Sequence, residues 1–203
     1  EQEFACKLCV ADERRRAHRE YTALQILNAA GVDVAPCPVG LDESELLAPF
    51  PAVVYAWMDG EPLNRSASDA QLAALRDALQ TVHAVEPGDR SPEPVAWFHW
   101  FDREQYLAEL TMFLDSYRAW LHTQVTGGSE LYARLERLVL ACMQAVRTRS
   151  VDISRAAVPL RWCHVDPNPA NLVWCPDQRL RWGDWEYSGW GDPALDLAAY
   201  RWH

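Results

Sequence analysis

Three polar residues in the last third of the chain have types and spacing that suit phosphoryl transfer. Asn171 follows Asp166 after five residues, and Asp184 lies eighteen residues after Asp166. One carboxylate could accept the proton of an attacking hydroxyl, while the carboxamide and the second carboxylate could hold Mg²⁺ on the phosphates of a nucleotide. The pattern therefore favours an enzyme that moves a phosphoryl group from a nucleotide to a hydroxyl.

The chain between these residues predicts a hairpin that would bring them together. Residues 172–174 and 180–182 are short apolar runs separated by a polar stretch. If they pair as antiparallel strands, Asn171 and Asp184 return to the same open end of the hairpin.

The first sixty residues predict a small strand–helix–strand unit. Residues 3–10 and 51–58 mix β-branched, aromatic and small apolar residues, which is typical of strands. Asp12 is expected to cap the intervening helix, and Pro36 and Pro38 to break the stretch before the second strand. The apolar positions of this helix have helical spacing and are Ala17, Tyr21, Leu24 and Leu27.

The middle of the chain predicts three longer helices. The first opens with a capping box from Ser68 to Gln71, and its apolar face consists of Leu72, Leu75, Leu79 and Val82. The second starts near Asp102 and carries Tyr106, Leu110, Phe113 and Tyr117. The third follows two glycines, Gly127 and Gly128, and its expected inward residues are Leu131, Leu135, Leu138, Cys142 and Val146.

Three motifs near the end of the chain together resemble one family. They are His-x-Asp-x-x-x-x-Asn at 164–171, Asp-Trp-Glu at 184–186 and Gly-Asp-Pro-x-x-Asp-Leu-Ala at 191–198. The chain resembles the aminoglycoside phosphotransferase and choline kinase family, which has a protein-kinase-like fold. The resemblance implies an α+β, two-lobed fold: an incomplete N-terminal nucleotide-binding lobe at 1–58, and a mainly helical C-terminal lobe at 59–203 with the catalytic and metal-binding loops.

The resemblance also implies a role for each matching residue. Asp166 corresponds to the catalytic base, and Asn171 and Asp184 correspond to the ligands of Mg²⁺. Three further residues are expected to order the loop rather than to react, namely His164, Asp192 and Asp196.

At the front of the chain, the resemblance implies that Lys7 and Glu20 pair and orient the phosphates of ATP. Lys7 is the only lysine among nineteen basic residues, and a compact ammonium suits a point-charge contact with phosphate. The strand at 51–58 resembles the hinge of the family, where backbone groups of three residues would hold the adenine: Ala56, Trp57 and Met58.

Two positions and both ends depart from the family pattern. Val165 stands where the family usually has Gly, and Gly183 stands where it usually has an aliphatic residue. No glycine precedes Lys7, and the chain stops at His203, soon after the last motif. We therefore expect a chain truncated at both ends relative to the family, without the glycine-rich loop that covers the phosphates.

Charge and composition argue against several other classes. The 203 residues carry a net charge of −10, which argues against binding to the phosphate backbone of a nucleic acid. The longest apolar runs are far shorter than the ~20 residues that span a bilayer, so no membrane partner is expected. Six scattered cysteines, in a chain long enough to build its own core, are typical of a reduced cytoplasm.

Charge also bears on the small-molecule partner. Residues 59–130 carry twelve acidic residues and five Arg, a net charge of −7. An acidic surface favours a cationic acceptor, such as an aminoglycoside, choline or another amino alcohol.

Other interpretations stay open. The chain could be a non-catalytic kinase-like module that binds a nucleotide or a partner, and a metal-dependent hydrolase using His164, Asp166 and Asp184 is a weaker alternative. The ten Trp residues suit core packing or, less simply, an aromatic cage for a cation. The Arg run at 14–16 is interpreted as a solvated helix face.

Overall fold

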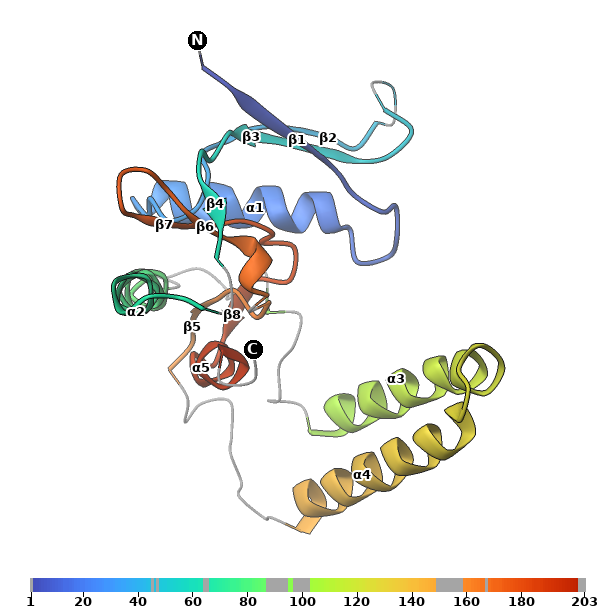
Figure 1. Ribbon diagram of the computed structural model, residues 1–203. Coiled ribbons are helices and arrows are strands. Elements are labelled where there is room, and N and C mark those ends of the chain that lie inside the picture. The colour runs from blue at the N-terminus through green and yellow to red at the C-terminus, as the bar shows by residue number, and fades with distance from the viewer. Residues whose placement is uncertain are drawn as a thin grey trace. The chain divides into compact units, whose positions relative to one another are not determined.

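The computed structural model describes residues 2–44, 46, 48–63, 66–86, 95–96, 103–148, 159–166 and 168–200. Contacts divide the chain into two compact units, Glu1–Phe98 with Pro159–His203, and His99–Val158. Short antiparallel sheets and helices make up the chain, which confirms the predicted α+β class (Figure 1). The division into lobes at residue 58 stays a prediction.

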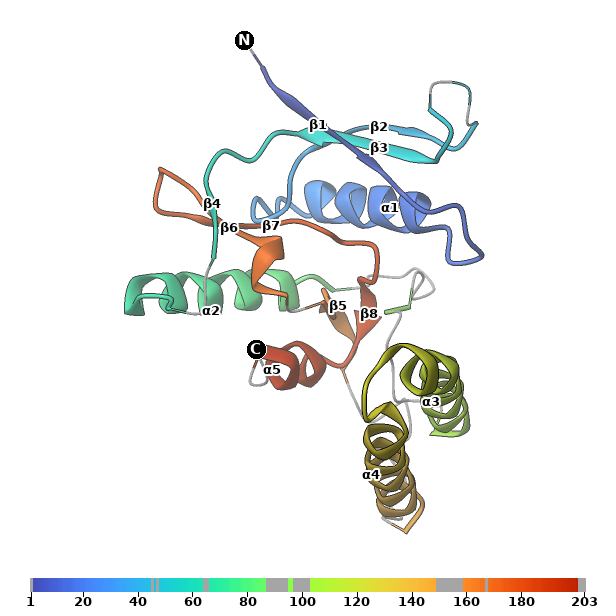
Figure 2. The same cartoon turned by 45° about the vertical axis from the view of Figure 1, so that its right-hand side comes forward.

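The first unit opens with a three-stranded antiparallel sheet in the order β1–β3–β2. Its strands are β1 (Phe4–Leu8), β2 (Pro38–Asp42) and β3 (Ala52–Ala56). Helix α1 (Arg16–Ala29) lies along one face of this sheet (Figure 2). Exposure alternates along β1, with Lys7 among the half-buried positions, so Lys7 points to the covered face of the sheet.

Strand β2 is a correction to the sequence prediction, which treated this stretch as broken by prolines. Pro38 is the first residue of β2, and β2 is an edge strand of the sheet. Proline is compatible with the first position of an edge strand because no ladder hydrogen bond from its nitrogen is needed there.

The start of α1 also differs from the prediction that Asp12 caps it. Arg15 precedes the helix with a φ of 50°, and no side chain caps its first turn. Asp12 instead closes the preceding turn, because its Oδ1 accepts a hydrogen bond from the backbone N of Arg14 at 3.1 Å.

The predicted hairpin is confirmed with the predicted bounds. Strands β6 (Leu172–Trp174) and β7 (Leu180–Trp182) pair antiparallel. A two-residue strand, β4 (Glu61–Pro62), extends this sheet on the β6 side. Gly60 precedes β4 with a φ of 149°, and a Cβ there would lie 2.4 Å from the carbonyl oxygen of Trp174. This close approach requires glycine.

The core of the first unit is rich in tryptophan. Strands β5 (Arg161–Cys163) and β8 (Gly189–Gly191) pair antiparallel. Four Trp side chains from this part of the chain are buried in the core, namely Trp162, Trp182, Trp185 and Trp190. Packing, the simpler of the two interpretations, therefore accounts for these four residues.

Helix α2 (Asp69–His83) begins at the predicted capping box. The side chain of Ser68 accepts a hydrogen bond from the backbone N of Gln71, and the Gln71 side chain accepts one from the backbone N of Ser68. Toward the end of the helix, Leu79 and Val82 are buried, as predicted. Leu72, in the first turn, is exposed.

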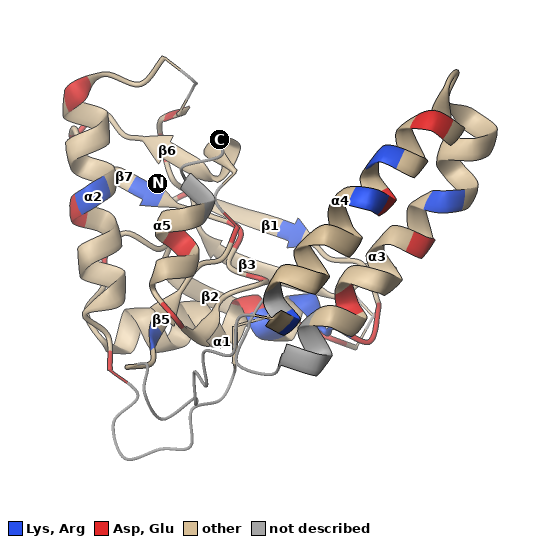
Figure 3. Cartoon of the chain, turned by 90° about the horizontal axis from the view of Figure 1, so that it is seen from below, with Lys and Arg blue, Asp and Glu red and all other residues tan. Residues whose placement is uncertain are grey.

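The second unit is a hairpin of two helices, α3 (Arg103–Gln124) and α4 (Gly128–Thr148). Leu114 and Leu121 lie seven residues apart on α3 and pack on Tyr132 of α4. Both helices carry acidic and basic residues (Figure 3).

The predicted inward face of α4 is wrong at Leu131, Leu138 and Cys142, which are exposed. The buried seam lies one position further along the helix, through Tyr132, and Leu135 packs at its edge. Among the described residues, no helix combines the length and the apolar character that a bilayer span requires.

Candidate active site

Lys7 lies at the centre of a cluster of three carboxylates in the first unit. Its Nζ is 2.5 Å from Glu20 Oε2, 2.5 Å from Asp184 Oδ1 and 3.2 Å from Glu186 Oε2. Glu20 reaches Lys7 because α1 packs on the sheet face to which Lys7 points. Two segments, α1 and the residues after β7, thus bring three carboxylates to one ammonium on β1.

Burial and charge together set the protonation of this cluster. Burial by itself lowers the pKa of Lys7, but the carboxylates of Glu20 and Asp184 outweigh it and raise that pKa above its ordinary value. Burial raises the pKa of Glu20 to about 7, although Lys7 opposes this shift. Glu20 is 1% exposed, and its Oε1 has no hydrogen-bond partner among the described residues. Glu20 therefore exchanges a proton near neutral pH.

The β6–β7 hairpin carries Asp184 to Lys7. Past the last strand pair, the backbone N of Gly183 donates to the carbonyl oxygen of Asn171 at 2.8 Å, so the two chains stay together beyond β6 and β7. Asp184 has a φ of 61°, a left-handed conformation that Asp tolerates better than most residues. The predicted return of Asn171 and Asp184 to one end of the hairpin is confirmed.

Asp166 and Asn171 contact each other directly. Asn171 Nδ2 donates to Asp166 Oδ2 at 3.0 Å, which leaves the amide oxygen of Asn171 for another partner. The two residues form a second contact group, which the backbone bond between Gly183 and Asn171 joins to the Lys7 cluster.

His164 is buried and ties the loop before Asp166 to the turn before Asp184. Its Nε2–H donates to the carbonyl oxygen of Gly183 at 2.8 Å, and its Nδ1 accepts from the backbone N of Asp166 at 3.2 Å. Burial lowers the pKa of His164, and its ring stacks on Trp182 with centroids 4.3 Å apart. A neutral imidazole with both nitrogens occupied supports the loop-ordering role expected of His164.

Asp196 is fully paired within the same region. Its Oδ2 accepts from the backbone N of His164 at 3.1 Å, and its Oδ1 accepts from the backbone N of Val165 at 2.8 Å. His83 Nε2, from the end of α2, donates to Oδ2 at 2.8 Å. Helix α5 (Ala194–Tyr200) carries Asp196, so this carboxylate ties the helix to the loop, as expected.

Asp192 has a separate and simpler role at the start of α5. Its Oδ1 accepts a hydrogen bond from the backbone N of Ala194 at 2.9 Å. This contact satisfies a donor in the first turn of α5, and it does not reach the loop around Asp166. Among the contacts of the described residues, Asp196 links α5 to the loop and Asp192 does not.

Val165 departs from the family pattern at a position with unusual backbone geometry. Its φ is 60°, in the left-handed region that favours glycine. A β-branched residue is strained there, and the two hydrogen bonds from His164 N and Val165 N to Asp196 hold the backbone in place.

Two arginines of α1 donate hydrogen bonds to the segment that follows Asp184. Arg16 Nη1 donates to Glu186 Oε1 at 2.5 Å. Arg19 donates to the carbonyl oxygens of Glu186 and Ser188 at 3.0 and 3.1 Å. The interpretation of residues 14–16 as a solvated face is therefore wrong for Arg16, because the fold places Glu186 within its reach.

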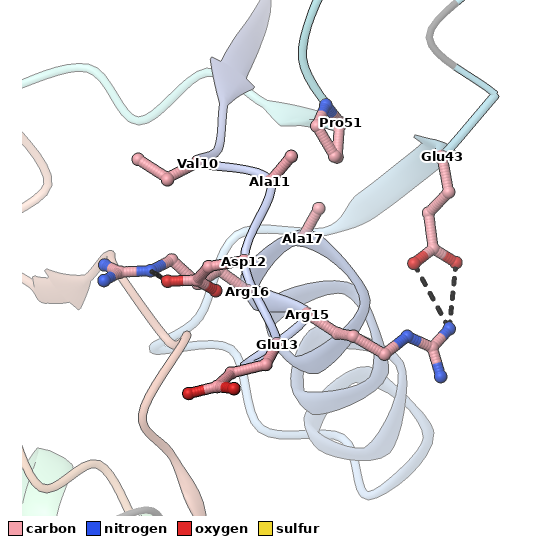
Figure 4. Close-up of a pocket in the computed structure, with 9 residues that line it drawn as sticks. All are labelled: Val10, Ala11, Asp12, Glu13, Arg15, Arg16, Ala17, Glu43 and Pro51. Carbon is pink, nitrogen blue, oxygen red and sulfur yellow. Dashed lines mark hydrogen bonds and ion pairs between the residues drawn. The ribbon is translucent and has the colours of Figure 1, made fainter.

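Arg15 and Arg16 extend to different sides of the helix start, where a pocket of about 380 Å³ lies. Figure 4 shows Arg15 reaching toward Glu43, and Arg16 turned away from it toward Asp12. Arg15 thus pairs with Glu43, and the carboxylates around Lys7 are not among its described contacts.

The expected hinge lies at the end of β3. The backbone N of Ala56 donates to the carbonyl oxygen of Cys37 at 2.9 Å, and that of Trp57 to the carbonyl oxygen of Glu3 at 3.0 Å. Ala56, Trp57 and Met58 contribute to the wall of a pocket of about 530 Å³. That adenine binds to these residues stays a prediction.

The donor atoms at the hairpin end fit a hard divalent cation. The Asn171 amide oxygen and the Asp184 carboxylate are oxygen ligands of the kind that Mg²⁺ takes, and the hairpin holds their backbones together.

Two buried groups with cysteine fit a metal less well. They are Cys9 with Glu20 and Glu186, and Cys163 with His83 and Asp196. Burial raises the pKa of Cys9 to about 11 and raises that of Cys163 even further. A metal would therefore have to displace a proton from either thiol, and the carboxylates of both groups already pair with Lys7, Arg16 or His83.

Sequence reasoning assigned no role to His83, Glu186, Arg16 or Arg19. Glu186 lies inside the Asp-Trp-Glu motif, and its acidic side chain two residues after Asp184 was the available signal. The other three act through partners more than a hundred residues away in the chain or through backbone carbonyls, which no local spacing indicates.

Comparison with solved structures identifies the fold. An aminoglycoside phosphotransferase from Alicyclobacillus acidocaldarius is 16% identical, with a TM-score of 0.59 over 97% of this chain and 60% of that chain. The aminoglycoside phosphotransferase APH(3'')-Id from Streptomyces rimosus is 19% identical, with a TM-score of 0.61 over 98% and 73%. The choline kinase LicA from Streptococcus pneumoniae is 21% identical, with a TM-score of 0.60 over 98% and 60%.

Three further findings complete the comparison. The chain spans only about 60% of the length of the first and third of these relatives. A search of curated proteins finds no match. The model of the phosphotransferase enzyme family, APH, matches residues 1–203, and the chain belongs to this family.

Proposed function

We propose that the protein transfers the γ-phosphoryl group of ATP to a hydroxyl of a small molecule, with Mg²⁺ as cofactor. The observation that carries this proposal is the contact of Lys7 with both Glu20 and Asp184 at 2.5 Å, next to the Asp166–Asn171 pair. Membership of a phosphotransferase family supports it. Similar solved proteins were crystallised with ADP or with AMP, which supports a nucleotide as the other substrate.

Each residue has one task in this proposal. Asp166 accepts the proton as the acceptor oxygen bonds to the γ-phosphorus and the bond to the β–γ bridging oxygen breaks, which releases ADP. Lys7, oriented by Glu20, contacts the phosphates of the nucleotide. Asn171 and Asp184 hold Mg²⁺, which when bound neutralises charge on the phosphates.

Binding of the nucleotide requires an exchange of partners at Lys7. Its ammonium faces three carboxylates in this structure. If Asp184 turns to the cation, Lys7 loses one carboxylate and gains a phosphate oxygen. Ala56, Trp57 and Met58 would hold the adenine by backbone groups other than the N–H groups of Ala56 and Trp57, which already donate to Cys37 and Glu3.

A cationic acceptor is the preferred substrate class in this proposal. Solved structures of similar proteins include complexes with streptomycin and with gentamicin, and also a choline kinase, and these three small molecules are cations. Residues 103–148 carry five acidic residues and five Arg, so the acidic excess lies earlier, in residues 59–102. We therefore attribute the preference for a cationic acceptor to the acidic residues in 59–102. We also propose that the protein works in the cytoplasm.

A transfer assay tests this function. ADP release is measured with ATP, Mg²⁺ and a panel of streptomycin, gentamicin, choline and neutral sugars. Asp166→Asn is expected to lower kcat by ~10²–10⁴ while nucleotide binding is kept, because the base is lost but the phosphate contacts remain. Asp115→Asn is the matched control, since Asp115 is exposed on α3, outside residues 59–102, and pairs with Arg118.

The outcomes separate the proposal from its alternatives. Full transfer by the Asp166→Asn protein would remove Asp166 from the mechanism. Faster turnover of neutral sugars than of cations would remove the cationic preference. The second candidate is a non-catalytic nucleotide-binding module, and the engagement of Lys7 by three carboxylates favours it. Nucleotide binding without ADP release on any acceptor would support that candidate.

A further inference from the structure

Glu186 shares its carboxylate between two cations. Its Oε1 accepts from Arg16 Nη1 at 2.5 Å, and its Oε2 accepts from Lys7 Nζ at 3.2 Å. The Glu186 side chain is 8% exposed and that of Arg16 is 20% exposed, so water screens these charges weakly. Neither contact follows from the chemistry that the proposed function assigns to Lys7.

The shared carboxylate matters for the ammonium. Lys7 has three hydrogens, and the three carboxylates that face it can accept all of them. A phosphate oxygen that approaches Lys7 must therefore compete with a carboxylate. A carboxylate that already binds a guanidinium attracts the ammonium less strongly, because its charge is partly neutralised.

We propose that Arg16 is a positioning residue for the nucleotide, which acts by drawing the Glu186 carboxylate away from Lys7 so that phosphate can take its place. This inference rests on the proposed function, since it concerns the same ammonium. Asp12 Oδ2 accepts from Arg16 Nε at 3.1 Å and fixes the guanidinium in this orientation.

Arg19, rather than Arg16, holds the backbone at Glu186. The charge of Arg16 can therefore be removed without removing the contacts that position Glu186. Arg19 Nε donates to the carbonyl oxygen of Glu186 at 3.0 Å, and Arg19 Nη2 donates to that of Ser188 at 3.1 Å. Removal of the Arg16 charge therefore leaves Glu186 beside Lys7. In that state Glu186 has Lys7 as its remaining cation among the contacts described, and it competes with phosphate.

A double-mutant cycle tests this inference in the full-length protein. Arg16→Gln, Glu186→Gln and the double variant are compared by calorimetric titration with Mg·ADP and by thermal unfolding. Arg16→Gln is expected to weaken Mg·ADP binding about tenfold, the scale of one charge-assisted hydrogen bond. In the Glu186→Gln background the same change is expected to cost less than about twofold, because no carboxylate is left to compete.

Two further variants test whether the positive charge at position 16 is what affects Mg·ADP binding. Arg16→Lys keeps a cation beside Glu186 and is expected to bind Mg·ADP within about threefold of the unmodified protein. Arg15→Gln is the matched control, since Arg15 is the preceding residue and pairs with exposed Glu43. It is expected to leave binding unchanged.

The outcomes that overturn the inference are distinct from failure of the proposed function. An equal loss of affinity from Arg16→Gln in both backgrounds, with an equal fall in Tm, would assign Arg16 a purely structural role. Unchanged binding by Arg16→Gln, in a protein that binds Mg·ADP and releases ADP in the transfer assay, would overturn this inference alone. An unmodified protein that binds no nucleotide would overturn both.

Discussion

Two carboxylate clusters in the first unit contrast in how their charges are paired. Around Lys7, three carboxylates face one ammonium, and Glu20 keeps an oxygen without a partner among the described residues. Around Asp196, one carboxylate accepts from two backbone N–H groups and from His83. The first cluster has more acceptors than its ammonium can satisfy, whereas the second has each oxygen satisfied.

The difference separates exchangeable contacts from permanent ones. A carboxylate held by backbone donors loses those bonds if it moves, and buried N–H groups without acceptors are costly. Carboxylates that share an ammonium can give it up when another anion or a cation arrives. We therefore expect the Asp196 cluster to contribute mainly to the free energy of unfolding. The contacts of the Lys7 cluster are expected to change when a ligand binds.

Asp196→Ala is expected to change stability more than any other variant that tests this contrast between the two clusters. The change leaves the buried backbone N–H groups of His164 and Val165 without an acceptor, and we expect it to lower the free energy of unfolding by about 3–4 kcal/mol. Urea denaturation measures this loss. Asp192→Ala, which removes only a contact at the start of α5, is expected to cost about 1 kcal/mol. If the two variants lost similar amounts of unfolding free energy, the Asp196 cluster would have no special role in stability.

The hairpin shows what the sequence could predict. Strands β6 and β7 have the predicted bounds, because two apolar runs close in sequence leave few ways to pair. The convergence of Asn171 and Asp184 followed from that pairing. The contact between Lys7 and Glu20 also matched its expectation, though it came from a family resemblance.

The parts that sequence reasoning missed depend on distant partners. Glu186 meets Arg16 across 170 positions, and His83 meets Asp196 across 113, so no local pattern pairs them. On α4, leucines occupy two adjacent faces, and only contact with α3 selects the one through Tyr132. Periodicity indicates an amphipathic helix, but the partner element decides its rotation.

The unpartnered oxygen of Glu20 predicts a pH dependence in the Lys7 cluster. The folded protein holds this proton up to about pH 7, whereas an unfolded Glu releases it near 4.5. The folded state therefore binds more protons in this window, and this carboxyl makes stability fall as pH rises through it. Glu20→Gln cannot titrate, so its free energy of unfolding relative to the unmodified protein should rise by roughly 2 kcal/mol between pH 5 and pH 8.

Thermal or urea unfolding at several pH values measures this difference. Glu136→Gln is the control, because Glu136 is a partly exposed acid of α4 and its neighbouring cation is Arg118, which stays charged between pH 5 and pH 8. Its effect should therefore not increase in the same direction over this range. A constant difference between Glu20→Gln and the unmodified protein would mean that Glu20 is ionised throughout, and that its cluster is as firmly paired as that of Asp196.

The smallest expected effect concerns the strain next to Asp196. Val165 has a φ of 60° and is buried, so its substitution removes packing but can also relieve the backbone. Alanine keeps the left-handed strain of about 1 kcal/mol, whereas glycine does not. We expect Val165→Gly to be about 1 kcal/mol more stable than Val165→Ala, and chemical denaturation measures the difference.

At Val82, a buried helical position, the order should be the reverse, because glycine lowers helix stability by roughly 1 kcal/mol relative to alanine. The same order at both positions would show that the Val165 backbone relaxes once its side chain is gone. In that case the hydrogen bonds to Asp196 would not hold the loop in a strained conformation. An opposite order at the two positions ties the strain to this loop, whose backbone donates two hydrogen bonds to Asp196.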